Sequence, residues 1–155
     1  MLIESILTPR RTRCGLSGGS KKRALELLAS TIAEDMPIID ADELFRHLVS
    51  RERLGSTGLG QGIAIPHCRI DNLTGPIGAL ITLNNPVAFD AIDSEPVDIL
   101  FALLVPEDTH DNHLQILSSL AEAFTNTDIR QSLRQADSDN TLFEAITQHS
   151  KKIDT

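Results

Sequence analysis

Val97-Asp-Ile-Leu-Phe-Ala-Leu-Leu-Val105 is the most hydrophobic run in this 155-residue sequence. A run of this kind is typical of a strand that is buried on both faces of a sheet. Pro106 ends the run because proline has no N–H to donate to a neighbouring strand. We expect Asp98, the charged residue within the run, to lie near a strand end or in an ion pair rather than to take part in chemistry. The run predicts the centre of a sheet that is covered on both faces.

Strand and helix patterns alternate on either side of this run. Strand patterns fall at 12–16, 63–65 and 77–83, with a turn at 84–86 and a short strand at 87–89. Helix patterns follow the capping residues Ser20, Asp40 and either Thr109 or Asp111, and two more fall at about 128–135 and 140–149. Residues 151–155 are expected to be frayed. Strands interleaved with helices predict an α/β fold with a mixed sheet and helices on both faces.

Composition and charge narrow the class of protein. Hydrophobic residues make up 41% and charged residues 23% of the chain, which is ordinary for a globular protein. The formal net charge of −8 argues against nucleic acid as the main partner. The absence of Trp and Tyr also argues against a stacking platform for single strands. The acidic surface either meets a basic protein surface or serves solubility alone.

The chain carries no sequence signal for a membrane or an oxidising compartment. No apolar run approaches the roughly 20 residues of a membrane span, and the N-terminus lacks the apolar core of a signal peptide. Cys14 and Cys68 are too few for a disulfide framework. We therefore expect residues 1–155 to form one cytoplasmic domain without membrane insertion.

Gly55-Ser-Thr-Gly-Leu-Gly-Gln-Gly-Ile-Ala-Ile-Pro-His67-Cys68 is the stretch with the most specific chemistry. Its glycines let the backbone approach a small ligand closely, and the loop N–H groups are predicted to form an anion-binding concavity. Ile63–Ile65 predicts a buried strand whose pairing ends at Pro66, which places His67 at the strand's carboxyl end. Ligands bind at that edge in open α/β sheets.

The glycine spacing excludes a nucleotide fingerprint. If the G-x-G-x-x-G pattern starts at Gly58 and Gly60 it needs glycine at 63, and if it starts at Gly60 and Gly62 it needs glycine at 65; both positions are Ile. The loop also precedes a strand, whereas a dinucleotide loop opens a helix.

His67 is either a buried core histidine or a nucleophile, since neutral imidazole carries a lone pair near pH 7. His113 follows Pro106, beyond a second buried strand, and is predicted to meet His67 at the same sheet edge. His110 and His113 lack the spacing of a structural zinc site, so we expect no metal. Arg51 and Arg53 are two residues apart on a helix, so only one is expected to reach the site. Cys68, adjacent to His67 in an extended segment, is expected to face the opposite way.

The segment from Arg51 to His67 resembles the active-site signature of the IIA proteins of the bacterial sugar phosphotransferase system, mannitol/fructose type. It is most similar to the nitrogen-regulatory branch, IIA-Ntr. Further blocks of the chain resemble the same family: Ser20–Leu25, Phe89–Asp93, Val97–Pro106 and His113–Leu117. The resemblance implies one type-2 EIIA domain over residues 1–155, folded as a three-layer α/β/α sandwich with a mixed sheet.

The resemblance also implies roles for individual residues. His67 matches the histidine that is phosphorylated through Nε2, His113 matches a second active-site histidine that contacts the phosphoryl group, and Arg51 matches the arginine that holds it. Gln61 stands where mannitol-type members carry glutamate, and Cys68 replaces a common glycine. No cofactor or metal is implied.

The function implied is that of a phosphotransferase and regulator. An HPr-like phosphocarrier, NPr in the nitrogen branch, would phosphorylate the chain, and the phosphorylation state would regulate targets such as ion transporters or sensor kinases. One alternative is a sugar-transport IIA domain that passes phosphate to a IIB partner. Another is a regulatory binding module of the same fold that is not phosphorylated.

Overall fold

The computed structural model describes the backbone of residues 3–107 and 112–154 and the side chains of residues 3–107 and 114–149. The elements follow in the order η1 (Ile3–Ser5), η2 (Pro9–Arg11), β1 (Thr12–Leu16), α1 (Lys21–Asp35), α2 (Ala41–Leu54), β2 (Gly58–Gly60), β3 (Ile63–Ala64), β4 (His67–Ile70), β5 (Ile77–Val87), β6 (Val97–Pro106), α3 (Asn112–Phe124), α4 (Thr127–Gln135) and α5 (Asp139–Asp154), where η marks a 3-10 helix.

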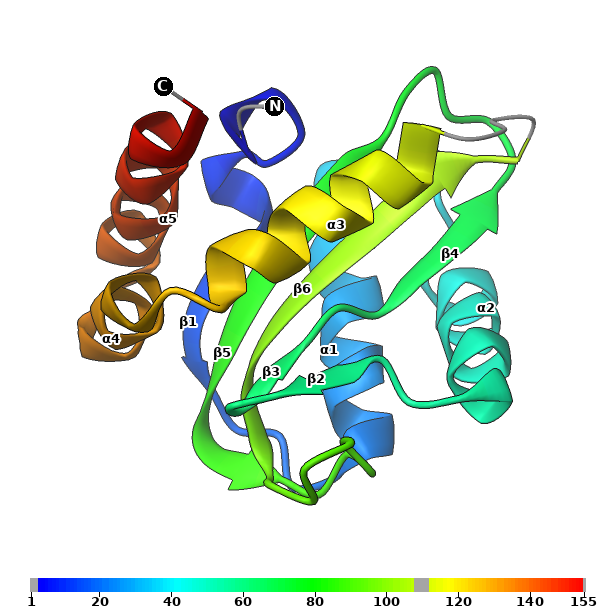
Figure 1. The fold of residues 1–155 in the computed structure, drawn as a ribbon. Coiled ribbons are helices and arrows are strands. Elements are labelled where there is room, and N and C mark those ends of the chain that lie inside the picture. The colour runs from blue at the N-terminus through cyan, green and yellow to red at the C-terminus, as the bar shows by residue number, and fades with distance from the viewer. Residues whose placement is uncertain (1–2, 108–111, 155) are drawn as a thin grey trace.

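The strands form a mixed six-stranded sheet in the order β1-β5-β6-β3-β2, with β4 also paired to β6 (Figure 1). β6 is antiparallel to β5 and parallel to both β3 and β4. Every residue of β6 is buried except Asp98, which is half-buried. The hydrophobic run Val97–Val105 is therefore the central strand, as its sequence predicts.

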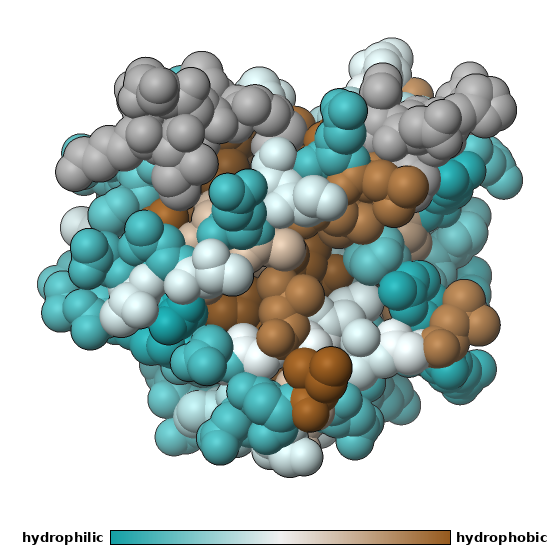
Figure 2. All heavy atoms as spheres, viewed as in Figure 1, coloured by the Kyte–Doolittle hydropathy of each residue, from teal (hydrophilic) through white to brown (hydrophobic). Residues whose placement is uncertain are grey.

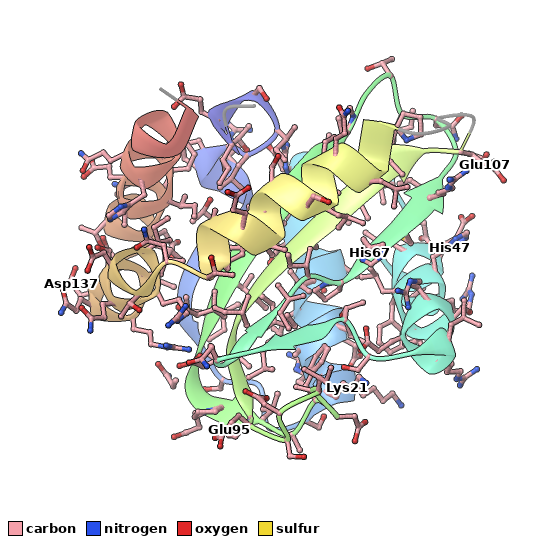
Figure 3. All side chains as sticks on the ribbon, viewed as in Figure 1. Lys21, His47, His67, Glu95, Glu107 and Asp137 are labelled. Atoms are coloured by element: carbon pink, nitrogen blue, oxygen red, sulfur yellow. The ribbon has the colours of Figure 1, made fainter. Side chains whose placement is uncertain are left out.

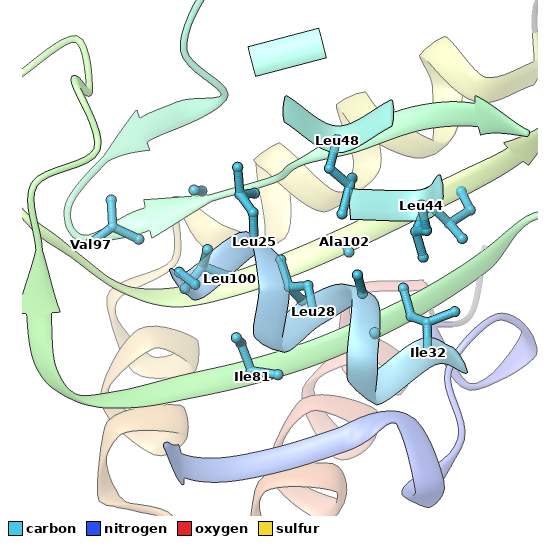
Figure 4. Close-up of a cluster of buried hydrophobic side chains, with 14 of the residues drawn as sticks. Leu25, Leu28, Ile32, Leu44, Leu48, Ile81, Val97, Leu100 and Ala102 are labelled. Carbon is cyan, nitrogen blue, oxygen red and sulfur yellow. The ribbon is translucent and has the colours of Figure 1, made fainter. Parts of the chain in front are cut away.

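Helices cover both faces of this sheet (Figure 1). On one face, α1 and α2 bury a cluster that includes Leu28, Leu44 and Leu100 (Figure 4). On the other face, α3, α4 and α5 pack with η1 over a second cluster that includes Phe101. The predicted three-layer α/β/α sandwich is confirmed. Within residues 3–107 and 112–154, no helix is both long and apolar enough to cross a membrane.

The helices on the α1/α2 face begin at the capping residues expected from the sequence. The Ser20 side chain accepts a hydrogen bond from the backbone N–H of Arg23, 3.0 Å away. The Asp40 side chain accepts one from the N–H of Glu43, at 2.9 Å. Each cap satisfies an N–H that has no partner within its own helix. The two candidate caps of α3, Thr109 and Asp111, lie outside the described residues.

Two boundaries differ from the sequence prediction. β5 continues through Asn84-Asn85-Pro86 to Val87, where a turn was expected, because a register shift after Thr82 accommodates the proline before Val87 pairs with Val97. α5 continues to Asp154, although residues beyond 150 were expected to be frayed. Its fully buried Leu142 and Ile146 anchor the helix against the sheet, and such packing outweighs local sequence preference.

Candidate functional site

His67 lies at the junction of two short strands that pair with β6. β3 ends at Ala64, and pairing with β6 resumes at His67, which is opposite Leu103. The Pro66 carbonyl still accepts a hydrogen bond from the N–H of Leu103, at 2.9 Å. The expectation that pairing ends at Pro66 is therefore wrong, because proline lacks a donor but keeps its acceptor. His67 begins β4 instead of following the last strand residue.

The orientation of the His67 ring is fixed by the backbone two residues earlier. The half-buried imidazole places Nδ1 2.8 Å from the carbonyl oxygen of Ile65. A carbonyl oxygen can only accept, so Nδ1 must carry a proton. In the neutral ring the lone pair is then on Nε2, which is the nitrogen that can act as a nucleophile.

Arg51 and His67 line the same cavity, of about 370 Å³. The walls come from the last turns of α2, from β4 and β6, and from Leu117 on α3. His47, from α2, lines the cavity too, and Figure 3 shows it on the neighbouring helix beside His67. The Arg51 guanidinium donates to the carbonyl oxygen of Gly55 at 3.0 Å, which ties it to the chain that follows the helix. We call this cavity the His67 cavity.

Arg53 faces a different part of the molecule. It lines a cavity between α1 and α2, whereas Arg51 lines the His67 cavity. Of the two arginines, only Arg51 lines the His67 cavity, and its approach to His67 itself stays a prediction.

The second predicted histidine is placed only by its backbone. His113 lies in the first turn of α3, one turn before Leu117, and Leu117 lines the His67 cavity. The side chain of His113, and all of His110, lie outside the described residues. The meeting of the two imidazoles therefore stays a prediction.

The glycine-rich stretch divides into two parts with different surroundings. Its first part runs beside the site, because the Thr57 carbonyl accepts a hydrogen bond from the N–H of Ile65 at 3.1 Å. Its last part, Gln61-Gly62, forms the turn of the β2–β3 hairpin with φ of 59° and 81°. Four extended residues, 63–66, lie between this turn and His67, so that five residue steps separate Gly62 from His67 by about 16 Å along the chain.

Three of the loop amides that were predicted to bind an anion donate to acceptors within the protein instead. The N–H of Thr57 donates to Glu52 at 2.8 Å, that of Gly58 to Ser56 at 3.0 Å, and that of Gln61 to Asp93 at 2.9 Å. The hydrogen bond from the N–H of Gln61, together with that from the N–H of Glu95, lowers the pKa of the Asp93 carboxyl. For these three amides the prediction was wrong, because two of the acceptors, Glu52 and Asp93, come from segments outside the glycine stretch.

Glu52 is a structural residue that the sequence reasoning missed. Its buried carboxylate accepts from the N–H of Thr57 at 2.8 Å and from the Thr57 hydroxyl at 2.7 Å, and it lies 3.1 Å from the ammonium of Lys21. It thus joins α1, α2 and the strand segment beside His67. An acidic residue in the last turn of a helix interacts unfavourably with the helix dipole. The position of Glu52 near the end of α2 was therefore the sequence feature that could have drawn attention to it.

Cys68 and Asp98 behave as expected. Cys68 packs with the core on the α1/α2 side, whereas His67 pairs with Leu103 of the opposite cluster, so the two neighbours face different ways although both line the His67 cavity. Burial raises the pKa of the Cys68 thiol to about 12, which keeps it protonated and unreactive near neutral pH. Asp98 forms an ion pair with Arg134 at 2.9 Å. Within the described residues, no three His, Cys, Asp or Glu side chains are grouped so as to hold a metal ion.

Comparison with known proteins identifies the class of this fold and site. Residues 5–149 match the family model described as phosphoenolpyruvate-dependent sugar phosphotransferase system, EIIA 2. The chain belongs to this family.

Individual relatives point to one branch of the family. The nitrogen regulatory protein of Pseudomonas aeruginosa is 47% identical over 144 residues, which cover 93% of this chain and 94% of that protein. The nitrogen regulatory protein of Escherichia coli is 42% identical over 146 residues, covering 94% and 89%. The crystal structure of nitrogen regulatory protein IIA-Ntr from Neisseria meningitidis has a TM-score of 0.82 at 40% identity, covering 94% of this chain and 99% of that one. The assignment to the nitrogen-regulatory branch, IIA-Ntr, is confirmed.

A more distant structure agrees in fold. IIA mannitol from Escherichia coli has a TM-score of 0.69 at 19% identity, and the match covers 85% of this chain and 92% of that one. This similarity supports the mannitol-type IIA architecture that the sequence predicts.

Proposed function

We propose that His67 accepts a phosphoryl group through Nε2 from the phosphohistidine of an HPr-like carrier, NPr, and that the phosphorylation state of the chain regulates target proteins. The observation that carries the proposal is the 2.8 Å contact from Nδ1 to the Ile65 carbonyl, which fixes both the ring and its tautomer. A nucleophile held in one orientation reacts without first being ordered.

In the proposed step, the lone pair of Nε2 attacks phosphorus as the bond between phosphorus and the donor imidazole breaks. The donor imidazole leaves with that electron pair, and the proton on Nδ1 of His67 stays in place. One phosphohistidine is consumed on the donor and one is formed on His67, so the P–N bond broken and the P–N bond made are of the same kind and the transfer is close to balanced in free energy. The residues of the site then act by positioning and by charge neutralisation.

Arg51 supplies the charge in this proposal. Its guanidinium has several N–H groups, of which one is directed at Gly55, and it lines the same cavity as His67. A planar guanidinium can bind two phosphoryl oxygens at once. His113 is proposed as the second contact to the phosphoryl group, since its backbone lies one turn from Leu117 in the wall of the cavity.

Apolar side chains around the His67 cavity support a protein as the donor. Leu54, in the cavity wall, is 83% exposed, and Leu114, at the start of α3, is 59% exposed. Figure 2 shows hydrophobic side chains gathered over α3 and over the strands below it, with hydrophilic ones around them. Exposed apolar surface of this kind marks protein–protein contact sites.

Incubation with phosphoenolpyruvate, enzyme I and the HPr-like carrier tests the proposal. The chain should gain one phosphoryl group that is labile to acid and stable to base, and His67→Ala should gain none. His149→Ala is the matched control, because His149 contacts Ser132 at 3.0 Å on another part of the molecule. Labelling of His67→Ala at the wild-type level would rule out the proposal. Affinity capture with His67→Ala and His67→Asp would then separate targets by phosphorylation state.

A sugar-transport role is the second candidate, and one relative favours it. The fructose-specific EIIA component of Haloferax volcanii is 33% identical over 129 residues, covering 83% of this chain and 84% of that protein. Transfer of the phosphoryl group from the chain to a purified IIB domain distinguishes the two roles. Rapid transfer would favour sugar transport, and its absence would favour regulation.

A further inference from the structure

A second cavity, of about 860 Å³, lies between the start of α1 and the second half of α2. Its volume is in the range of roughly 300–1,000 Å³ that small-molecule sites occupy. We call it the basic cavity and define it by two groups of lining residues: the cations Lys22, Arg46 and Arg53, and the apolar residues Leu25, Phe45 and Val49.

Two carboxylates, Glu52 and Asp90, also line the basic cavity, but both lie beside a fourth lining cation, Lys21. Within the described residues, Lys22, Arg46 and Arg53 make no ion pair or hydrogen bond through their side chains. The neighbouring Lys21 differs, since its ammonium lies 3.1 Å from Glu52 and 3.5 Å from Asp90. Three like charges thus gather at one cavity in a chain whose net charge is −8. Such a cluster attracts an anion locally even when the whole molecule repels it.

The first turn of α1 adds an independent reason to expect an anion. Lys21, Lys22 and Arg23 fill this turn, and it contains no acidic residue. Cations at a helix N-terminus oppose the helix dipole, whereas α2 and α4 follow the usual rule with Asp42 and Asp128 in their first turns. Lys21 and Arg23 have acidic partners in Glu52, Asp90 and Glu26, so a bound anion would interact favourably with the positive end of α1 and with Lys22.

The spacing of the residues on α2 defines the shape of the ligand. Arg46, Val49 and Arg53 are three and four residues apart and so lie along one face of the helix. The two arginines are about 10 Å apart along the axis, with apolar surface between them. Phe45 and Val49 are half-buried and Leu25 is buried, so these three side chains form an apolar surface against which the apolar ring of a ligand can pack.

We propose that the basic cavity binds a phosphorylated small molecule of nucleotide size. Its apolar ring would lie on Leu25, Phe45 and Val49, and its phosphates would contact the flanking cations. The site is separate from the His67 cavity, because the two lie on different sides of the last turns of α2 and share only the lining residue Ser50. Figure 3 shows Lys21, at the start of α1, and His67 in different parts of the molecule.

Two-dimensional amide NMR with ADP as the probe tests this proposal. ADP should produce saturable shifts confined to residues 21–25 and 45–53 at about physiological ionic strength, where long-range repulsion by the net charge is screened. Inorganic pyrophosphate should bind at least about fivefold more weakly, and adenosine should not saturate. His67→Ala should bind ADP as wild type does, which keeps this result independent of the phosphorylation proposal.

Paired variants separate the cavity from the overall charge. Arg46→Gln with Arg53→Gln should weaken ADP binding about tenfold or more. Arg10→Gln with Arg13→Gln removes the same net charge outside the cavity and should change binding less than about twofold. Equal weakening by both pairs, equal affinity for pyrophosphate and ADP, or no saturable shift at millimolar ADP would overturn the proposal. So would binding to phosphatidylglycerol vesicles without binding to ADP, which would assign the basic cavity to a membrane surface.

Discussion

Replacing Glu52 with glutamine should destabilise the protein because Glu52 joins three separate segments. The carboxylate is 4% exposed and lies 3.1 Å from Lys21, whose side chain is 23% exposed. It also accepts both the N–H and the hydroxyl of Thr57, at 2.8 Å and 2.7 Å. Glutamine keeps the shape and one acceptor, but it leaves Lys21 without this buried counter-charge and gives Thr57 a donor in place of an acceptor.

The magnitude follows from these contacts. Hydrogen bonds to charged groups contribute about 1.5–3 kcal/mol each, and loss of a buried ionic partner costs about 3–5 kcal/mol. Because Lys21 is partly exposed and one Thr57 bond survives, we expect a loss of about 2 kcal/mol in the free energy of unfolding. For a chain of 155 residues this loss corresponds to a decrease in Tm of about 4–8 °C.

Urea unfolding followed by far-ultraviolet circular dichroism measures the effect, since the chain has no Trp or Tyr to report by fluorescence. Glu26→Gln is the matched control, because Glu26 is 42% exposed and 3.9 Å from Arg23. It should cost less than about 0.5 kcal/mol. Amide exchange at Thr57 should accelerate in Glu52→Gln alone. If Glu52→Gln were as stable as Glu26→Gln, the reasoning about this contact would be refuted.

Three further predictions concern a hairpin turn, a buried thiol and the arginine of the site. Gly62→Ala should lower the free energy of unfolding by about 1–3 kcal/mol, because φ is +81° and a Cβ would meet the side chains of Arg134 and Asp98. Gly75→Ala is the control: a Cβ there meets open space, so the free energy of unfolding should change by less than about 0.5 kcal/mol. Denaturant unfolding measures both variants. The pKa of the Cys68 thiol is raised from 9.0 to about 12, so in a Cys14→Ala background the folded protein should react with iodoacetamide at about pH 8 roughly 10³-fold more slowly than the protein unfolded in urea. The contribution of this thiol to stability should be lost only as the pH rises from 9.0 toward 12. Equal reaction rates in the folded and unfolded protein would contradict the burial of Cys68. Arg51→Lys should slow phosphoryl transfer at least about tenfold with an unchanged circular dichroism spectrum, because lysine cannot make a bidentate contact; unchanged rates would remove the role of Arg51.

The fold was largely predictable because its main signals are local or depend on simple patterns. The run Val97–Val105 has the composition of a central strand, and Ser20 and Asp40 cap helices through contacts only three residues away. Hydrophobic periodicity indicates which face of each helix and strand is buried, and it therefore supported the prediction of a sheet between two layers of helices. The continuation of strand β5 through Pro86 was not predictable in this way, since it depends on pairing between Val87 and Val97.

The candidate site was predictable only in part. Residues two apart on a helix face different ways, so the spacing of Arg51 and Arg53 predicted that at most one would lie beside His67, and only Arg51 of the two lines the His67 cavity. Partners that come from distant segments could not be read from the sequence. Arg11 is an example outside the site: it is 6% exposed and donates to the Gly78 carbonyl at 2.9 Å, across 67 residues of chain. The hydrogen bond from Gln61 to Asp93 is of the same kind, and it makes the Gln61 amide unavailable to the anion that the sequence predicts there.

The central claim is that His67 reacts through Nε2 because the Ile65 carbonyl holds Nδ1 as a donor at 2.8 Å. Phosphorus–proton correlation NMR on the chain phosphorylated by its carrier tests this claim most directly, since coupling to the ring protons identifies the substituted nitrogen. We predict one phosphoryl group, on Nε2 of His67. A phosphoryl group on Nδ1 of His67, or on any other residue, would contradict the account.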